Sequence, residues 1–277
     1  MRSINCKGKL IYLDTPNVMG VLNITPDSFY DGGSYKDEQD ILRQAEKMLN
    51  DGATFIDVGA YSSRPGATDV SVDEECMRLI PVVKLLVKNF PDILLSIDTF
   101  RAKVAREAVL VGASLINDIS AGLIDDQMLQ TVSELKVPYI LMHMRGTPQT
   151  MKALTQYEDL VKEVISYLSE RVAAARVLGI NDVIIDPGFG FAKTVSQNFK
   201  LLNATDQLQI LDLPLLIGLS RKSMITKTLD VDAQSALNGT TVLNTIALEK
   251  GASILRVHDV KEAVEAVKLY QTLIASA

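Results

Sequence analysis

The stretch DGATFIDVG, residues 51–59, joins a glycine, a short apolar run and a polar residue, and near-copies of it recur along the chain. They read VGASLIND (111–118), LGINDVIID (178–186) and KGASILRVH (250–258). A glycine in this place ends a helix in the left-handed conformation and turns the chain back towards a sheet. Runs of Ile, Leu and Val without strict alternation indicate parallel strands buried on both faces. The stretch therefore predicts a repeating unit of helix and strand.

Four further apolar runs bring the number of expected strands to eight: VMGVLN (18–23), LLSID (94–98), YILMH (139–143) and LLIGLSRK (215–222). Apolar residues at three- and four-residue spacing predict amphipathic helices between the runs. These cover 41–49, 72–89, 101–111, 126–135, 158–178, 198–208, 221–229, 234–250 and 260–274. Eight alternations favour a (β/α)8 TIM barrel over an open doubly wound sheet. We expect the segment INCKGKLIYL (4–13) to form a β-hairpin that covers the barrel floor.

The composition is that of an ordinary globular protein and predicts a single domain over residues 1–277. The chain is 47% hydrophobic and 22% charged, and no linker or low-complexity tract divides it. A net charge of −6 argues against nucleic acid or an anionic membrane as a partner. Cys6 and Cys76 lie in no cluster, the start lacks a secretory pattern, and no apolar run reaches 18 residues. We therefore expect a cytoplasmic protein that spans no membrane and keeps its thiols reduced.

Polar residues close several of the apolar runs. Asp98, Asn117 and Asp186 end three of them, and Lys222 follows a fourth. One such acid can simply cap the next helix, but the carboxyl ends of parallel barrel strands meet at one face. Four groups converging there favour a pocket for a flat, nitrogen-rich heterocycle with amide and amine edges. Asp57 is interpreted as support for this site.

A second set of polar residues is suited to an anion. Arg256 and His258 stand two residues apart at the last strand end, so we expect their side chains on the same side. Together with Asn23 and Arg64 they can surround a group such as a phosphate. His143 also closes a run but has no comparable neighbour, and we interpret it as structural or supporting.

Two long polar loops, NITPDSFYDGGS (23–34) and GAYSSRPGA (59–67), fall on the predicted active face. Long irregular loops in compact domains are typical of lids. The run DPGFGF (186–191) lacks the GxGxxG pattern of dinucleotide sites. It predicts instead a tight turn that positions Asp186 and the ring of Phe191.

The run GLSRKS (218–223) predicts a helix start. Ser220 can cap a helix that begins at Arg221, and a helix start beside cations attracts a carboxylate or phosphate. No Ser/His/Asp arrangement for nucleophilic catalysis is evident.

The chain resembles the dihydropteroate synthase family of the folate pathway over about residues 18–260. The matching motifs, in order, are MGVLNITPDSF (19–29), SSRPGA (62–67), SIDTFRA (96–102), INDISAG (116–122), DPGFGF (186–191), LPLLIGLSRKSMI (213–225) and RVHDV (256–260). The resemblance implies a transferase that condenses (7,8-dihydropterin-6-yl)methyl diphosphate with 4-aminobenzoate and releases pyrophosphate. It also implies Mg²⁺ as cofactor, sulfonamides as inhibitors and a homodimer.

The resemblance also assigns roles to residues. The pterin contacts would be Asp98, Asn117, Met142, Asp186, Phe191, Gly218 and Lys222. The diphosphate contacts would be Asn23, Arg64, Arg256 and His258, with Asn23 also a Mg²⁺ ligand. The 4-aminobenzoate contacts would be Ser63, Pro65, Ser220, Arg221 and Ser223. Catalysis would depend on Asp31, Arg64, Lys222, Arg256 and His258, with Asp31 in the first loop closing over a cationic intermediate.

One departure from the family pattern lies in the second loop. The family's usual GGESTRPGA is here GAYSSRPGA, so that Ala60, Tyr61 and Ser63 replace Gly, Glu and Thr. Ser63 keeps a hydroxyl, and we expect its contact to survive. Two alternative functions stay open: the methyltetrahydrofolate domain of a corrinoid methyltransferase, and a non-catalytic pterin binder. The first has no need of the SRPG loop, and the second has no need of an anion set.

The chemistry of the implied substrates favours a dissociative displacement. Ring nitrogens of the dihydropterin can delocalise a cation at the methylene carbon, so that the diphosphate can leave before the amine attacks. The aromatic amine is neutral at pH 7, and no strong general base is required.

Overall fold

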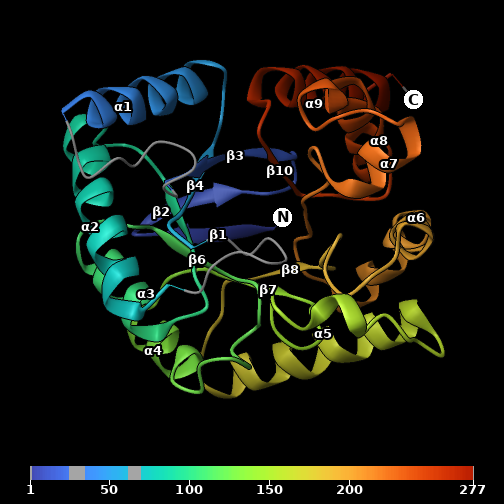
Figure 1. Cartoon of the computed structure of the whole chain (residues 1–277), viewed down its shortest axis with the longest axis horizontal. Helices are drawn as coiled ribbons and strands as arrows, with labels where there is room; N and C mark the ends of the chain where they lie inside the picture. Colours follow the sequence, from blue (N-terminus) through green and yellow to red (C-terminus); the bar gives the residue numbers. More distant parts are fainter. Residues whose placement is uncertain (1, 25–34, 62–69, 277) are drawn as a thin grey trace.

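The computed structural model describes residues 2–24, 35–61 and 70–276 (Figure 1). Its main sheet is parallel, with the strand order β8-β7-β6-β5-β4-β3-β10-β9. An isolated parallel bridge between Ile185 and Leu215 joins the two edges of this sheet. The strands are β3 (Asn17–Asn23), β4 (Phe55–Gly59), β5 (Leu95–Asp98), β6 (Leu115–Asp118), β7 (Tyr139–Met142), β8 (Val183–Asp186), β9 (Leu216–Ile217) and β10 (Ile254–Val257). The predicted (β/α)8 TIM barrel is confirmed.

Helices surround the barrel and bury their apolar faces against it (Figure 1). The α-helices are α1 (Tyr35–Asn50), α2 (Val72–Asn89), α3 (Ala102–Leu110), α4 (Met128–Leu135), α5 (Leu160–Val177), α6 (Val195–Asn203), α7 (Ser223–Leu229), α8 (Leu237–Glu249) and α9 (Val260–Ile274). Short 3₁₀ turns are η1 (Met151–Ala153), η2 (Thr205–Leu211) and η3 (Gln234–Ala236). No helix among the described residues is long and apolar enough to cross a membrane.

The helix expected over 198–208 is interrupted, which corrects the prediction. The α-helix α6 ends at Asn203, and η2 continues as a 3₁₀ turn. The backbone N–H of Ala204 is shared between the carbonyls of Lys200 and Leu201, and the hydroxyl of Thr205 donates to Leu201 as well. This competition at the carbonyl of Leu201 accounts for the tighter turn, because the hydroxyl occupies a helix acceptor.

The four glycines that precede strands in the repeated stretch have the left-handed backbone that the sequence predicts. The φ angle is +100° at Gly52 and +130° at Gly112, and it is also positive at Gly179 and Gly251. A Cβ on Gly112 would also lie 2.7 Å from a methyl group of Val87 in α2. Glycine is therefore required here both by the backbone conformation and by the close approach of α2.

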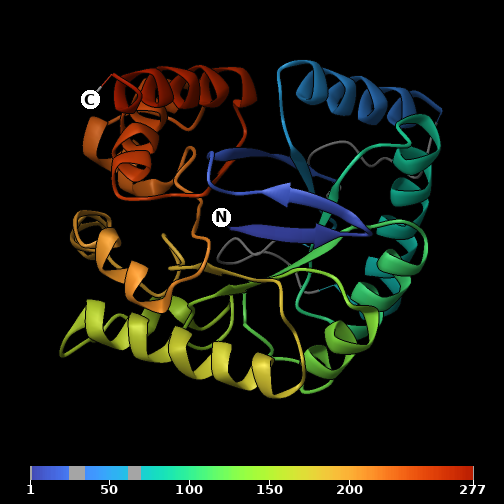
Figure 2. The same cartoon turned by 180° about the vertical axis from the view of Figure 1, so that it is seen from behind.

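An N-terminal hairpin closes one end of the barrel, as predicted. Strand β1 (Ser3–Cys6) pairs antiparallel with β2 (Lys9–Tyr12). Four hairpin side chains and the first residues of the barrel strands form one buried cluster. The hairpin lies across the barrel on the side from which Figure 2 is viewed. It covers the amino ends of the strands, so the polar carboxyl ends lie at the opposite face.

Candidate active site

Polar side chains from neighbouring strands converge at the carboxyl ends of the barrel. Asp98 on β5 is the register partner of Asn117 on β6, and Asp186 ends β8 beside Met142 of β7. The predicted convergence of Asp98, Asn117 and Asp186 at one face of the barrel is thus seen in the structure.

Arg256 of β10 links two of the carboxylates into one network. Its Nε donates to Oδ2 of Asp57 at 2.6 Å, and its Nη2 donates to Oδ2 of Asp98 at 2.8 Å. Asn117 Nδ2 donates to the same Asp57 oxygen at 3.0 Å. Asp57 is fully buried, and its Oδ1 has no hydrogen-bond partner among the described residues. An unpaired acceptor buried in this way is costly, because it has lost the hydrogen bonds that water provides in the unfolded chain.

Burial shifts the acids and the lysine of this pocket towards neutrality. It raises the pKa of Asp98 to about 7, against the opposing effect of Arg256. It also raises the pKa of Asp186, which Lys222 partly opposes, and lowers the pKa of Lys222 to about 8. The pocket therefore holds groups that can donate or accept near pH 7.

The turn after β8 forms one wall of the pocket. The backbone N–H of Gly188 donates to Oδ1 of Asp186 at 2.7 Å, and that of Phe191 donates to the carbonyl of Gly188 at 3.2 Å. The Nζ of Lys222 donates to the carbonyl of Phe189 and lies 5.0 Å from the centre of the Phe191 ring. This confirms the predicted tight turn at 186–191.

An apolar cluster supports this wall. It contains Met142 together with Tyr61, Val70, Phe100, Ile119, Met144, Met151 and Ala192, and Phe191 packs against it. Tyr61, which replaces the usual family glutamate, meets the ring of Phe100 edge-on at 5.1 Å. Its hydroxyl accepts a hydrogen bond of 2.8 Å from Gln149. The replacement is therefore accommodated by burial of the ring and by a polar contact of its hydroxyl.

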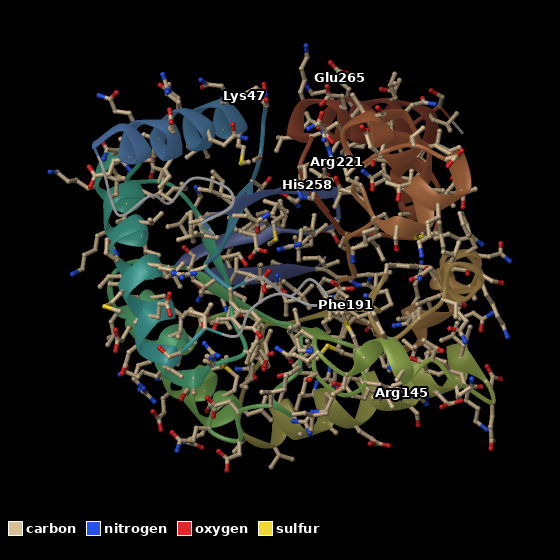
Figure 3. The ribbon with its side chains drawn as sticks, viewed as in Figure 1. Lys47, Arg145, Phe191, Arg221, His258 and Glu265 are labelled. Carbon is tan, nitrogen blue, oxygen red and sulfur yellow. The ribbon has the colours of Figure 1, made fainter. Side chains whose placement is uncertain are left out.

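His258 and Ser220 meet at the same face. The Oγ of Ser220 lies 3.0 Å from Nδ1 of His258 and also accepts the backbone N–H of His258 at 3.2 Å. Among the described residues, Arg256 contacts two carboxylates, whereas His258 contacts the hydroxyl of Ser220. Figure 3 shows Phe191 and His258 over the barrel, whereas Lys47 and Glu265 lie on the outer helices.

The predicted helix start at Arg221 is wrong. Helix α7 begins at Ser223, and Arg221 has a φ of +56°, outside the helical region. Its backbone N–H donates to the hydroxyl of Thr240, and its guanidinium forms two hydrogen bonds with Asp259, at 2.9 and 2.6 Å. The hydroxyl of Ser220 is occupied by His258 instead of capping the helix. Tertiary contacts with α8 and with the end of β10 therefore override the local capping signal.

The remaining predicted residues lie as follows. Asn23 ends β3 with its side chain partly exposed, next to Gly59 of β4 in the register. A Cβ on Gly218 would lie 3.9 Å from the Cβ of Arg256 and 4.0 Å from Nζ of Lys222, so Gly218 adjoins both residues. Asp31, Ser63, Arg64 and Pro65 lie outside the described residues, as does most of both predicted lid loops.

Two functional features carry no clear sequence signal. Asp57 belongs to the charged network itself, although the sequence suggests only support. His143, for which no partner was expected, lies 2.9 Å from Nζ of Lys193. Both contacts join residues at least 50 positions apart. No local pattern marks such pairs.

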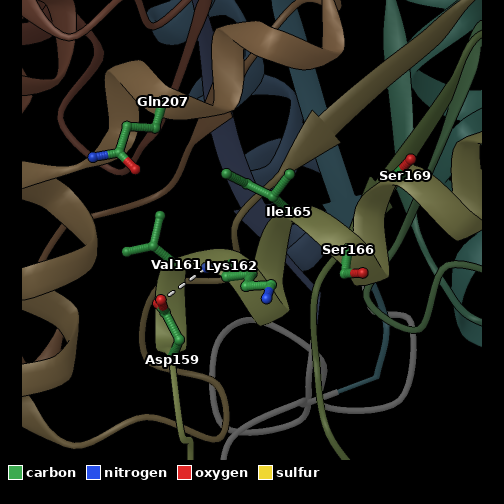
Figure 4. Close-up of a pocket in the computed structure, with 7 residues that line it drawn as sticks. All are labelled: Asp159, Val161, Lys162, Ile165, Ser166, Ser169 and Gln207. Atoms are coloured by element: carbon green, nitrogen blue, oxygen red, sulfur yellow. Dashed lines mark hydrogen bonds between the residues drawn. The ribbon is translucent and has the colours of Figure 1, made fainter.

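A separate cavity of about 400 Å³ lies on the outer ring of helices, between α5 and η2 (Figure 4). It is lined by Asp159, Val161, Lys162, Ile165, Ser166, Ser169 and Gln207. The Asp159–Lys162 contact drawn there is the cap of α5, in which the side chain accepts the backbone N–H at 3.3 Å. No residue of the strand-end pocket lines this cavity.

Comparisons with known proteins point to one family. The family model of pterin binding enzymes matches residues 19–258. The dihydropteroate synthase of Escherichia coli K12 is 43% identical over 272 residues, which cover 98% of this chain and 96% of that protein. A Yersinia pestis dihydropteroate synthase in complex with a sulfonamide drug has 40% identity and a TM-score of 0.92, covering 99% of this chain and 100% of that chain. A Xanthomonas albilineans dihydropteroate synthase with 4-aminobenzoic acid has 40% identity and a TM-score of 0.91, covering 99% and 98%.

Proposed function

Since the chain belongs to the dihydropteroate synthases of the pterin-binding enzyme family, we propose that its strand ends hold the pterin while a dissociative displacement joins it to 4-aminobenzoate. The observation that carries this proposal is the buried network in which Arg256 bridges Asp57 and Asp98. It lies at the same mouth as Asp186 and Lys222. A ring cation formed there meets fixed negative charge in a preorganised site.

The pterin edge is read by side chains with complementary hydrogen-bonding groups. Asp98 and Asp186 accept from amine and amide N–H groups, and the buried Asp57 supports them through Arg256 and Asn117. Asn117 and Lys222 donate. Met142 and Phe191 pack on the ring faces, and Gly218 adjoins Lys222 at the edge of the same site. This group of acceptors suits a ligand with several N–H donors, such as the 2-amino and amide edge of a pterin, better than it suits an apolar ligand.

The displacement proceeds in two stages. The bond between the methylene carbon and the diphosphate oxygen breaks, and its electron pair leaves with the diphosphate. The amine nitrogen of 4-aminobenzoate then bonds to that carbon and loses a proton. The carboxylates stabilise the intermediate cation, and Asp31 is assigned the same role by the resemblance to the family.

The departing diphosphate is held by Asn23, Arg64, Arg256 and His258. The guanidinium of Arg256 has five N–H donors, and its two described carboxylate contacts leave others for an anion. Asn23 offers a partly exposed amide oxygen, a ligand type suited to Mg²⁺ that carries substrate phosphates. Mg²⁺ bound at Asn23 would supply positive charge that neutralises the leaving group.

The second substrate is proposed to lie near residues 220–223. Ser220, Arg221 and Ser223, with Ser63 and Pro65, would surround 4-aminobenzoate. The double hydrogen bond with Asp259 fixes the guanidinium of Arg221 in one orientation. Sulfonamides, which share the shape and aromatic amine of 4-aminobenzoate, are proposed as competing inhibitors. The structural neighbours determined with 4-aminobenzoic acid and with a sulfonamide support this assignment.

We further propose a homodimer formed through α8 and α9. This face carries exposed apolar side chains, among them Val242, Ile246, Leu269 and Leu273. A cavity of about 550 Å³ lies between the two helices. Exposed apolar patches of this kind are typical of subunit interfaces. Two free, buried thiols, Cys6 and Cys76, support a cytoplasmic location.

The function is tested by measuring pyrophosphate release with both substrates, with each substrate alone, and with and without Mg²⁺. We expect rapid, sustained release only when both substrates and Mg²⁺ are present, and slow release from the pterin substrate alone with Mg²⁺, because water can capture the cation in place of the amine. Pterin binding without any release would instead support the non-catalytic pterin binder. Methyl transfer from methyltetrahydrofolate would support the methyltransferase alternative.

A further inference from the structure

Lys193 is a buried lysine that the proposed mechanism does not use. Its side chain is 8% exposed, and its Nζ has three acceptors. These are Nδ1 of His143 at 2.9 Å, the carbonyl of Gly188 at 2.9 Å and the carbonyl of Phe191 at 3.1 Å. An ammonium group has three N–H donors and no acceptor, so the three contacts satisfy it completely. Removing this group leaves three buried acceptors without their donor.

In the contact with Lys193, the imidazole of His143 accepts the hydrogen bond. Its ring is 1% exposed and meets the ring of Tyr167 edge-on at 4.8 Å. The pKa of His143 is lowered to about 2, chiefly by burial and also by the neighbouring charges of Lys193 and Arg145. The imidazole is therefore neutral, with Nδ1 as the acceptor and the proton on Nε2. Its backbone N–H also donates to the carbonyl of Asp186, which ties β7 to the start of the turn.

The two backbone acceptors of Lys193 lie at both ends of the turn 188–191. Between them the carbonyl of Phe189 accepts from Lys222, and at the end the Phe191 ring faces the same Lys222. On the other side of the turn, the side chain of Asn198 accepts the backbone N–H of Gly190 at 2.7 Å. Lys193 thus fixes the backbone from which both contacts with Lys222 arise.

We propose that Lys193, with His143 as its acceptor, is a positioning residue of the pterin subsite, which holds the turn 188–191 so that Phe191 and Lys222 meet the pterin. This inference rests on the proposed pterin site. Lys193 and His143 act on the pocket indirectly, through the backbone of the turn 188–191. Loss of the ammonium group shifts the turn, and a displacement near 1 Å is enough to weaken a preorganised site strongly.

The surroundings of Lys193 disfavour a positive charge on its side chain. The pKa of Lys193 is lowered to about 7, chiefly by burial; Asp186 opposes this shift, and Lys222 and Arg145 add to it. The polar, uncharged partners agree with this direction, because no carboxylate among the described residues contacts the ammonium group directly.

The test compares Lys193→Met with Lys200→Met, which changes an exposed lysine of α6. Affinity for 6-hydroxymethylpterin is measured by calorimetry, together with kcat and both KM values. We expect Lys193→Met to bind the pterin about 10-fold more weakly, with the KM for 4-aminobenzoate changed less than about two-fold. The control variant should match the wild type. A folded Lys193→Met protein with wild-type pterin affinity would overturn the proposal.

A second pair of variants decides the matter if Lys193→Met does not fold. His143→Asn places an amide oxygen near the position of Nδ1, whereas His143→Leu offers no acceptor. We expect the Asn variant to keep pterin affinity within about three-fold and the Leu variant to lose about 10-fold. Equal affinities in the two variants would contradict the assigned role. Failure of the wild type to bind the pterin would refute the proposed function as well, and so is distinguishable from failure of the variants alone.

Discussion

At the scale of single residues, hydrogen bonds between charged and polar side chains fix the geometry of the site. Arg256 lies between Asp57 and Asp98, and Asn117 fixes the oxygen of Asp57 that the guanidinium contacts. A buried pair of this kind contributes little net stability, but breaking it leaves unpaired charge in a low-dielectric interior. The arrangement therefore favours one orientation of the carboxylates before any ligand arrives.

Replacing Arg256 with Met should lower the free energy of unfolding by about 3–5 kcal/mol, because the fully buried Asp57 and the partly buried Asp98 lose their counter-charge. Arg221→Met is the matched control, since its partner Asp259 keeps 15% of its side chain exposed whereas Asp57 is fully buried, and it should lose less. Urea denaturation at pH 7.5 measures both. Similar losses in the two variants would show that burial of the Arg256 network is energetically unimportant.

Lys193 should make stability depend on pH in a defined direction. Its pKa is about 7 in the folded protein and near its ordinary value of 10.5 in the unfolded chain. Between these values the unfolded chain binds more protons, so this residue makes stability rise with pH. From pH 7 to pH 9 the contribution amounts to roughly 2 kcal/mol.

The measurement is urea denaturation of the wild type and of Lys193→Met at pH 7 and pH 9. The variant should lack this part of the rise, while Lys200→Met should retain it. A rise of equal size in the wild type and in Lys193→Met would refute the low pKa.

At the scale of elements, the turn after β8 positions several groups of the pocket. The turn after β8 brings Asp186, Phe191 and the carbonyl that binds Lys222 to one side within six residues. Gly188 makes this possible, since its φ is +70° and a Cβ there would lie 2.0 Å from the carbonyl oxygen of His143. No rearrangement of a flexible side chain can relieve a contact with backbone.

Gly188→Ala should therefore destabilise the protein far more than Gly179→Ala. Both glycines have positive φ, but a Cβ on Gly179 meets nothing within 4 Å. We expect about 1 kcal/mol for Gly179→Ala from backbone strain alone, and at least about 3 kcal/mol, with weakened pterin binding, for Gly188→Ala. Thermal unfolding and calorimetry check both outcomes. Equal destabilisation would mean that the turn relaxes easily around the added methyl group.

At the scale of the whole molecule, the barrel separates its two ends by function. The hairpin of β1 and β2 buries apolar residues against the strand starts, which leaves the carboxyl ends open for the polar network. The outer helices carry the face that we propose for the dimer interface. Helices α8 and α9 lie in this outer layer (Figure 1) and carry exposed apolar side chains.

A charged substitution on this face should separate the proposed dimer. The double variant Leu269→Glu and Leu273→Glu places two charges where both side chains are about 70% exposed in one chain. We expect sedimentation velocity to show a monomer, with pterin affinity retained. Leu110→Glu on α3, an equally exposed leucine, should leave the dimer intact. A wild type that sediments as a monomer, or a double variant that stays dimeric, would contradict the assigned interface.

Local patterns determined a large part of this protein. The apolar runs, the four glycines and the helical spacing are properties of neighbouring residues, and they predicted the barrel with its hairpin floor. The same holds for Asp98, Asn117 and Asp186, because a residue at the end of a parallel strand lies at the active face in any such barrel. The motifs around them were specific enough to indicate the family.

Only the tertiary structure decided which of these groups touch. Arg256 meets Asp57 from 199 positions away, and Lys193 meets His143 across 50, because barrel closure and the turn after β8 bring distant segments together. The hydroxyl of Ser220 binds His258 instead of capping a helix at Arg221, since contacts with β10 and α8 outweigh the local preference. Position along a strand is encoded locally, whereas pairing between side chains depends on how the whole chain closes.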